Sequence, residues 1–287
     1  MHRVFISGLL PWVEPKRLLG PGNWTVDSRS AHGELPTHAA ADLDARLRGI
    51  SIGGSAIAFD AQPALPRAAV RAARTTDARR RRDGSVGFSR PGIRLDEEGR
   101  VSLTPEALAL ALGERFSGRT VVDAGCGAGG NSIGFARAGC RVIAVERDGK
   151  RLADARHNAA VYGVTSQIEF VSGEAVAVAT RHADPDAVLF VDPPWGVEWD
   201  RGGMGLAAFP LLDALLASGV PQRYGSIVVK LPPSFRAGEL FWARPEAVYG
   251  VGAGDARRVK FLLLVGVGAV STSATADPAP RPSGTAL

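Results

Sequence analysis

Residues 121–130 read VVDAGCGAGG, and this stretch decides the fold. An apolar run ends at Asp123 and passes into a glycine-rich loop, after which the sequence takes on a helical pattern. Glycines let the backbone turn tightly and approach a ligand closely, and the amino end of a helix adds a positive dipole. Gly125, Gly127 and Gly130 complete a G-x-G-x-x-G pattern, which is typical of dinucleotide sites but is not specific by itself. The stretch therefore predicts a strand, a ligand-binding loop and a helix.

Short β-branched runs alternate with helical stretches on both sides of this loop. Such alternation is typical of βαβ units around a buried parallel sheet. Runs at 247–251 and 259–267 predict a final hairpin at the sheet edge. We therefore expect an α/β, Rossmann-like fold with a mostly parallel, seven-stranded sheet and helices on both faces. The other expected strands are 120–124, 141–146, 168–172, 187–192 and 226–231, and the expected helices are 131–138, 149–162 and 206–217.

The chain before this region has a different character. Prolines and glycines punctuate residues 1–66 and predict a small, irregular N-terminal region. Residues 67–82 carry arginines at helical spacing, which predicts a basic helix or arm, with a solvated linker as an equal alternative. Thr104 is expected to cap a helix that begins at Pro105 and runs to about residue 116. We divide the chain into an N-terminal region at 1–84, an α/β domain at 85–270 and a disordered tail at 271–287.

Acidic residues follow three of the expected strands. A carboxylate at Asp123 would repel a pyrophosphate but attract a cationic amino acid, which favours S-adenosylmethionine over NAD as the cofactor. Glu146 ends the second strand, where an acid binds ribose hydroxyls. Glu174 follows the third strand, where a carboxylate can accept a hydrogen bond from the adenine amino group.

The fourth strand ends in the most specific motif, Asp192-Pro193-Pro194-Trp195. In an open α/β sheet, ligands bind beyond the carboxyl ends of the strands. The two prolines fix the backbone and remove two N–H donors, so nearby carbonyls can accept hydrogen bonds from an amine. Trp195 offers a flat face on which a purine can stack. We expect Asp192, Pro193, Pro194 and Trp195 to form the catalytic part of the site.

These motifs resemble those of amino-methylating, S-adenosylmethionine-dependent methyltransferases, and most closely the trimethylguanosine synthase family of RNA cap guanine-N2 methyltransferases. The likeness covers about residues 85–235. Besides D-P-P-W, the segments that carry it are DAGCGAGGNSIGFA at 123–136, ARHNAAVYG at 155–163, FSR at 88–90, GIRLDEEG at 92–99 and SLTPE at 102–106.

The resemblance implies a class I methyltransferase fold and a guanine stacked on Trp195, with its amine held at the Pro-Pro turn. It also implies the cofactor contacts, for which we expect Asp123, Gly125, Gly127, Asn131, Glu146 and Glu174. The chain departs from the family where Asp192 stands in place of the usual serine, a substitution closer to the amine clamp of adenine-N6 methylases. It also departs before residue 88, where four arginines replace an aromatic-rich stretch.

The chain is basic, with a formal net charge of +5 over 287 residues. Only four of its 34 basic residues are lysines, so arginine supplies the rest. Arginine pairs with phosphate in a fork geometry, which favours a polyanionic partner, although a GC-rich genome gives the same bias. We expect an RNA substrate, with phosphate contacts from Arg67, Arg71, Arg74, Arg79, Arg80, Arg81 and Arg82.

Cysteine content and hydropathy exclude other classes. Cys126 and Cys140 are too few for a disulfide framework or a conventional zinc cluster, so we expect both to be buried and no metal site. No apolar run approaches the ~20 residues of a membrane span, and residues 4–10 are too short for a convincing signal peptide. We expect a cytoplasmic protein without membrane contact.

The sequence thus predicts an S-adenosylmethionine-dependent methyltransferase of an exocyclic purine amine in RNA. Guanine-N2 is favoured over adenine-N6. The alternatives are a methyltransferase of a small-molecule or nucleoside amine, and a catalytically silent RNA-binding module on the same scaffold.

Overall fold

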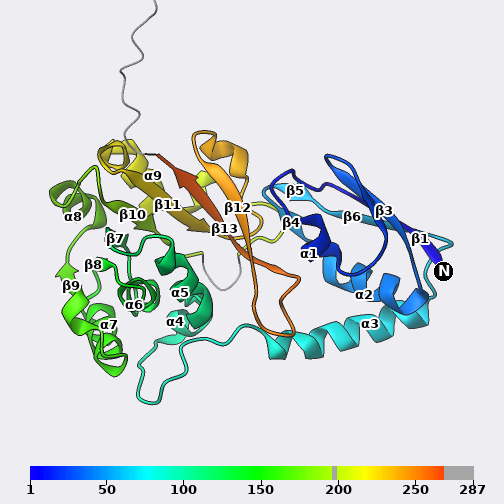
Figure 1. Cartoon of the computed structure of the whole chain (residues 1–287), viewed down its shortest axis with the longest axis horizontal. Coiled ribbons are helices and arrows are strands. Elements are labelled where there is room, and N and C mark those ends of the chain that lie inside the picture. Colours follow the sequence, from blue (N-terminus) through cyan, green and yellow to red (C-terminus); the bar gives the residue numbers. More distant parts are fainter. Residues whose placement is uncertain (196–198, 268–287) are drawn as a thin grey trace, which may run out of the picture.

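The computed structural model describes residues 1–195 and 199–267, and it contains a seven-stranded sheet (Figure 1). The strand order is β12-β13-β11-β10-β7-β8-β9. Strands β7 to β11 pair in parallel, and β13 is antiparallel to both of its neighbours. The predicted sheet and its final hairpin are therefore confirmed. The strands are β7 (Thr120–Ala124), β8 (Arg141–Glu146), β9 (Ile168–Ser172), β10 (Val188–Val191), β11 (Ser226–Leu231), β12 (Arg244–Tyr249) and β13 (Val259–Gly266).

Helices pack on both faces of this sheet, as predicted (Figure 1). Both side-chain faces of the central strands are apolar and buried: Val121 faces the core under α5, α6 and α7, and Val122 faces the core under α8 and α9. The helices are α4 (Glu97–Ser102), α5 (Glu106–Glu114), α6 (Gly130–Arg137), α7 (Gly149–Val161), α8 (Ala175–Arg181) and α9 (Pro210–Ala217).

Two helix predictions need correction. Pro105, not Thr104, is the N-cap of α5, and it provides no side-chain cap. The Thr104 hydroxyl is instead buried without a hydrogen-bond partner. The single helix expected at 206–217 is split into a short 3₁₀ turn and α9, because Pro210 starts a new helix at the position where its missing N–H costs nothing.

Residues 1–66 are not irregular, so this prediction was wrong. They form a four-stranded antiparallel sheet with the order β2-β3-β1-β6, and two helices pack beside it. In β1, Val4 and Ile6 are buried and the residues between them are exposed, so the period-2 pattern was present in the sequence. The elements are β1 (His2–Ser7), α1 (Pro15–Leu19), β2 (Trp24–Val26), β3 (Ser30–Leu35), α2 (Thr37–Leu47), β4 (Ser51–Ile52), β5 (Ser55–Ala56) and β6 (Ala58–Gln62).

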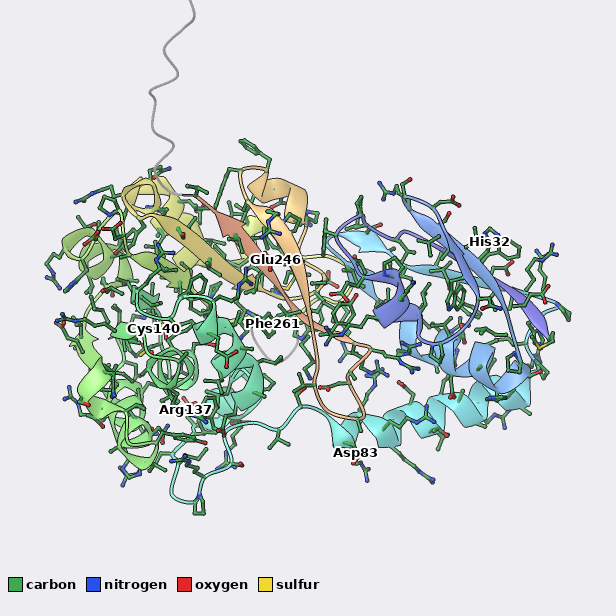
Figure 2. The ribbon with its side chains drawn as sticks, viewed as in Figure 1. His32, Asp83, Arg137, Cys140, Glu246 and Phe261 are labelled. Atoms are coloured by element: carbon green, nitrogen blue, oxygen red, sulfur yellow. The ribbon has the colours of Figure 1, made fainter. Side chains whose placement is uncertain are left out.

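The basic segment forms α3 (Arg67–Arg80), which runs along the lower edge of the molecule in Figure 1. Figure 2 shows Asp83 just beyond its end and His32 on the N-terminal sheet. Of the two alternatives for this segment, a basic helix and a solvated linker, the structure shows the helix. The expected tail at 271–287 lies outside the described residues.

The N-terminal unit contacts both the β12–β13 hairpin and the loop that follows β11. The Tyr249 hydroxyl donates a hydrogen bond to the Glu14 carbonyl (3.3 Å), and the Arg17 guanidinium lies over the Tyr249 ring, 4.6 Å from its centre. The Gly53 N–H donates to the Pro233 carbonyl (2.8 Å) in the loop that follows β11. This second contact brings the N-terminal unit next to a loop at the carboxyl edge of the sheet.

Two further observations concern the cysteines and membrane-spanning helices. Cys126 and Cys140 are free and buried, as expected. Over the described ranges, none of the helices is long and apolar enough to span a bilayer.

Helices α5 and α6 cross with very little space between them, which gives a stability prediction. A Cβ placed on Gly134 would lie 2.5 Å from the backbone carbon of Ala109, which cannot move aside as a flexible side chain can. We expect Gly134→Ala to lower the free energy of unfolding by about 1–3 kcal/mol, despite the better helix propensity of alanine.

The measurement is urea denaturation followed by circular dichroism. Gly149→Ala is the matched control, because Gly149 is also helical and has no atom within 4 Å of the new methyl group. Equal midpoints for the two variants would contradict the close crossing of α5 and α6.

Candidate active site

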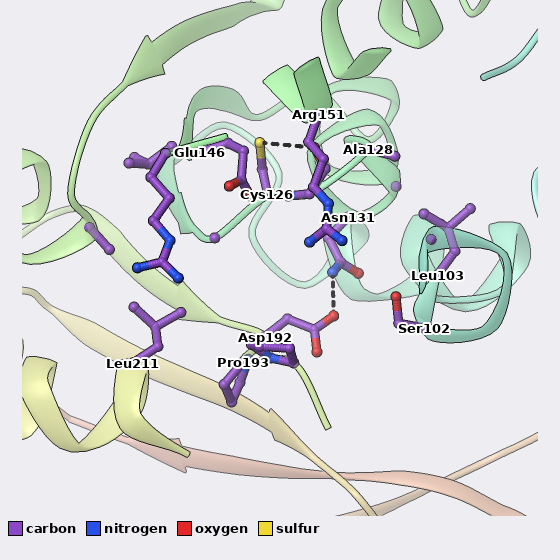
Figure 3. Close-up of a pocket in the computed structure, with 18 of the residues that line it drawn as sticks. Ser102, Leu103, Cys126, Ala128, Asn131, Glu146, Arg151, Asp192, Pro193 and Leu211 are labelled. Atoms are coloured by element: carbon purple, nitrogen blue, oxygen red, sulfur yellow. Dashed lines mark hydrogen bonds between the residues drawn. The ribbon is translucent and has the colours of Figure 1, made fainter. Parts of the chain in front are cut away.

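One cavity of about 450 Å³ lies at the carboxyl ends of the parallel strands β7 to β10 (Figure 3). The topology brings together there the loops that follow four strands far apart in the sequence. All of the predicted site residues except Asp123 line it. They are Gly125, Gly127, Asn131, Glu146, Glu174, Asp192, Pro193, Pro194 and Trp195.

The glycine loop forms one wall of the cavity, and its shape requires glycine. Gly125 and Gly127 have φ angles of 91° and 53°, in the left-handed region that side chains disfavour. The N–H groups of Gly125 and Cys126 both donate to the Val145 carbonyl, at 3.0 and 2.8 Å. These bonds fix the loop against the end of β8.

Glu146 joins the loop to the second strand. It is only 9% exposed, and its two carboxylate oxygens accept hydrogen bonds from the Gly127 N–H (3.0 Å) and the Asp148 N–H (2.9 Å). Each oxygen retains a further lone pair for a hydroxyl of a ligand. Glu174 is exposed at the start of α8 and forms no capping bond there, so its carboxylate is available to the cavity.

Asp123 is placed differently from the expectation. It is completely buried at the end of β7 and does not line the cavity. Its Oδ2 accepts a 2.6 Å hydrogen bond from the Ser132 hydroxyl, whereas Oδ1 is buried without a partner. The pKa of Asp123 is raised to about 7, chiefly by burial; the hydrogen bond from Ser132 opposes this rise, and the nearby charge of Asp192 adds to it.

This buried carboxyl predicts a pH-dependent stability. Between about pH 4 and pH 7 the native protein retains a proton on Asp123 that the unfolded chain, with a pKa of 3.8, has released. The free energy of unfolding should therefore fall as the pH rises through this window. In Asp123→Asn this contribution is absent, so the variant should gain about 2–4 kcal/mol relative to wild type between pH 4 and pH 8.

Urea denaturation of wild type and Asp123→Asn at pH 4 and at pH 8 measures the difference in their free energies of unfolding. Asp186→Asn, at an exposed position, is the control. A stability difference between Asp123→Asn and wild type that does not change with pH would contradict the buried, protonated carboxyl.

Asp192 lies at the centre of the opposite wall, directly after β10. Its Oδ2 accepts hydrogen bonds from Asn131 Nδ2 (2.8 Å) and from Lys230 Nζ (2.7 Å). Figure 3 shows the side chain of Asn131 pointing at Asp192 across the cavity. Because both bonds use Oδ2, Oδ1 has no hydrogen bond to any other described residue. The arrangement leaves one carboxylate oxygen to accept from a ligand.

Lys230 was not among the predicted site residues. Lys230 is the penultimate residue of β11, is 2% exposed and pairs with Asp192. Only the adjacency of β10 and β11 reveals this pair, since 38 residues separate the two in the sequence.

Pro193 is buried, Pro194 is exposed, and Trp195 is half-buried beside the cavity. The Lys230 ammonium lies over the Trp195 ring, 4.9 Å from its centre, and Trp199 packs edge-on at 6.4 Å. The residue after Trp195 in the motif, Gly196, is outside the described residues.

The sequence also missed the segment that covers the cavity, residues 96–104, which includes α4. Asp96 caps α4 by accepting from the Gly99 N–H (2.7 Å), and it pairs with Arg151 of α7 at 2.8 Å. Asn158 holds the preceding backbone, because its side chain bonds both the N–H and the carbonyl of Arg94. Asp96 and Asn158 lie in segments that carry the family resemblance. This resemblance was the signal in the sequence that could have assigned the segment to the site. The lining residues from this segment are Asp96, Gly99, Ser102, Leu103 and Thr104.

The part of the chain that contains the glycine loop and the D-P-P-W motif matches a known family. Residues 118–202 match the family model described as RNA cap guanine-N2 methyltransferase. The trimethylguanosine synthase of Schizosaccharomyces pombe (strain 972 / ATCC 24843) is 36% identical over 119 residues, which are 38% of this chain and 49% of that protein. The chain thus spans about half the length of this curated relative. The resemblance expected from the sequence is confirmed over this part of the chain.

Solved structures are similar in fold. A Porphyromonas gingivalis W83 protein assigned as a methyltransferase has a TM-score of 0.50 and 17% identity, covering 71% of this chain and 51% of its own. An RNA methyltransferase of Salinibacter ruber, in complex with S-adenosyl-L-homocysteine, has a TM-score of 0.39 and 18% identity, covering 61% of this chain and 98% of its own. The first likeness confirms the predicted class I methyltransferase fold.

Proposed function

We propose that this protein is an S-adenosylmethionine-dependent methyltransferase that modifies an exocyclic amine of a purine base in RNA, with guanine-N2 as the favoured position. The observation that carries the proposal is the cavity itself. A glycine loop and Glu146 form its cofactor side, and Asp192-Pro193-Pro194-Trp195 form the side opposite. The family match at 118–202 covers both sides.

The cofactor side fits S-adenosylmethionine. Two residues that line the cavity, Thr104 and Asn131, each have a buried polar side-chain atom without a hydrogen-bond partner, and such atoms are costly unless a ligand or water satisfies them. Glu146 would hold the ribose hydroxyls and Glu174 the adenine amino group. When bound, this cofactor supplies an electrophilic methyl group on a sulfonium.

The acceptor side needs only to position the amine. Asp192 would accept a hydrogen bond from the amine through Oδ1, while Asn131 and Lys230 hold its other oxygen. Trp195 would stack on the purine. Orientation and the exclusion of water supply most of the rate enhancement in such a transfer, so no strong base is required.

The RNA contact proposed for the basic helix α3 centres on three of its arginines. Arg80 and Arg81 already pair with Asp42 and Asp77, each at 3.1 Å. Arg67, Arg71 and Arg74 are exposed on one face of α3 and line a groove, and none of them forms an ion pair with another described residue. This spacing places three cations where a phosphate backbone can meet them.

We expect the triple variant Arg67→Gln, Arg71→Gln, Arg74→Gln to bind RNA more weakly at low salt. The slope of log affinity against log salt should fall by about 2, since each lost phosphate contact on single-stranded RNA removes about 0.7. Filter binding to a short RNA at several salt concentrations measures it.

The matched control replaces three exposed arginines at the amino-terminal edge of the sheet, Arg141, Arg181 and Arg223. An equal loss in both triple variants would refute a specific role for α3.

The experiment for the proposed function is transfer of a labelled methyl group to total RNA, followed by nucleoside analysis. N2-methylguanosine supports it as stated, and N6-methyladenosine would move the acceptor to adenine. Label on free nucleosides or small amines alone would favour the small-molecule alternative. A protein that binds S-adenosylhomocysteine and RNA but transfers nothing would favour the silent module. We also propose a cytoplasmic location, based on its cysteine usage.

A further inference from the structure

Lys230 is the buried charge that the proposed methyl transfer does not by itself explain. Its side chain is 2% exposed and it does not line the cavity, so it approaches the site from the protein interior. There it makes three contacts. Its Nζ lies 2.7 Å from Asp192 Oδ2, 4.9 Å from the centre of the Trp195 ring and 5.3 Å from the centre of the Phe261 ring.

This position changes the electrostatics of the acceptor side. The Lys230 ammonium balances the charge of Asp192, so this pair has no net charge with which to attract a cation. The same ammonium already occupies one side of the electron-rich Trp195 ring, and Trp195 faces the cavity as well. A second cation stacked on the other side of that ring would be repelled by the Lys230 ammonium.

Among the described residues, the other acidic side chains that line the cavity do not offset this effect on the acceptor side. Asp96 is paired with Arg151. Glu146 ends β8 and Glu174 follows β9, whereas Asp192 follows β10 and Lys230 lies in β11. The sheet order places β7 between these two pairs of strands. The cation-attracting half of the cavity is therefore the half assigned to the cofactor.

We infer that Lys230 makes this site selective for an uncharged guanine and against a guanine with a fixed positive charge, such as the N7-methylated guanine of an RNA cap. This inference rests on the proposed function. It gives the departure from the family at Asp192 a physical meaning, because a serine at this position would bring no charge for a buried lysine to balance. The substrate class is then a guanine in RNA that carries no fixed positive charge.

The test compares two ligands that differ in one methyl group and one charge, guanosine 5′-monophosphate and its N7-methyl derivative. Their affinities for protein saturated with S-adenosylhomocysteine are measured by calorimetry, which requires no methyl transfer. For wild type we expect the unmethylated nucleotide to bind at least about tenfold more tightly, equivalent to about 1.4 kcal/mol. In Lys230→Met this ratio should shrink at least about tenfold or invert, because the cation behind Trp195 is gone.

Two variants serve as controls. Lys230→Arg retains the charge and should retain the preference, which separates charge from packing. Lys16→Met removes an exposed lysine of α1 and should change nothing. Thermal unfolding and the affinity for S-adenosylhomocysteine establish that each variant is folded.

Equal or tighter binding of the N7-methylated nucleotide by wild type would overturn the inference, as would an unchanged ratio in Lys230→Met. Failure of the proposed function gives a different result. In that case neither nucleotide binds to the protein loaded with S-adenosylhomocysteine, and the inference falls with it.

Discussion

Replacing Asp192 with asparagine is expected to lower kcat for methyl transfer to RNA by a factor of about 10²–10³, because a misplaced acceptor costs about that much. The substitution keeps the size of the side chain but removes the charge that holds Lys230 and Asn131. The amide oxygen would accept from those two donors, which places the amide nitrogen where Oδ1 was, and an NH2 group donates and cannot accept from the amine. Affinity for S-adenosylhomocysteine should stay within a few fold of wild type, since Asp192 belongs to the acceptor side.

The measurement is single-turnover transfer of a labelled methyl group, together with calorimetry for the cofactor product. Asp186→Asn, at an exposed position before β10, is the matched control and should behave as wild type. If Asp192→Asn retained full activity, the assignment of the D-P-P-W motif to the acceptor would be wrong.

Replacing Glu146 with alanine is expected to weaken binding of S-adenosylhomocysteine by at least about 100-fold. The change removes the acceptor for two N–H groups, those of Gly127 and Asp148, and hydrogen bonds to a charged group contribute about 1.5–3 kcal/mol each. It also removes the proposed partner of the ribose hydroxyls.

Calorimetry on Glu146→Ala and on Glu169→Ala tests this, because Glu169 is an exposed acid on the neighbouring strand β9. Equal affinities for the two variants would exclude Glu146 from the cofactor site.

Much of the larger sheet could be predicted because its strands β7 to β10 are short runs that end at, or lead directly into, a polar or glycine residue. The run before Asp123 and the run before Asp192 are apolar on both faces, which only a doubly covered sheet allows. The positions of Glu146 and Asp192 at one edge then followed from parallel topology alone.

The N-terminal sheet could not be recognised in the same way. Its strands are short, several have mixed burial, and glycines and prolines interrupt the pattern between them. The alternation in β1 was visible, but a single strand does not reveal its partners. The antiparallel pairing of β1 with β6, more than 50 residues apart in the sequence, is seen only in the tertiary structure.

The two surprises at the site have the same origin. Lys230 is buried against Asp192 because β10 and β11 are neighbours in the sheet. Asp123 is buried beneath the loop because the end of β7 lies deep in the fold. The spacing of these residues in the sequence predicts neither arrangement. The sequence analysis gave expected roles to Asp123 and Asp192, whereas the charge balance between Asp192 and Lys230 was found only in the structure.

The central claim is that the glycine loop binds S-adenosylmethionine and not a dinucleotide. Calorimetric titration of the purified protein with S-adenosylhomocysteine, with NAD in parallel and Glu146→Ala alongside, tests it most directly. We predict one-to-one, micromolar binding of S-adenosylhomocysteine that is weakened in Glu146→Ala, and no binding of NAD. Binding of NAD, or no binding of S-adenosylhomocysteine by protein shown to be folded, would contradict the assignment of this fold to methyl transfer.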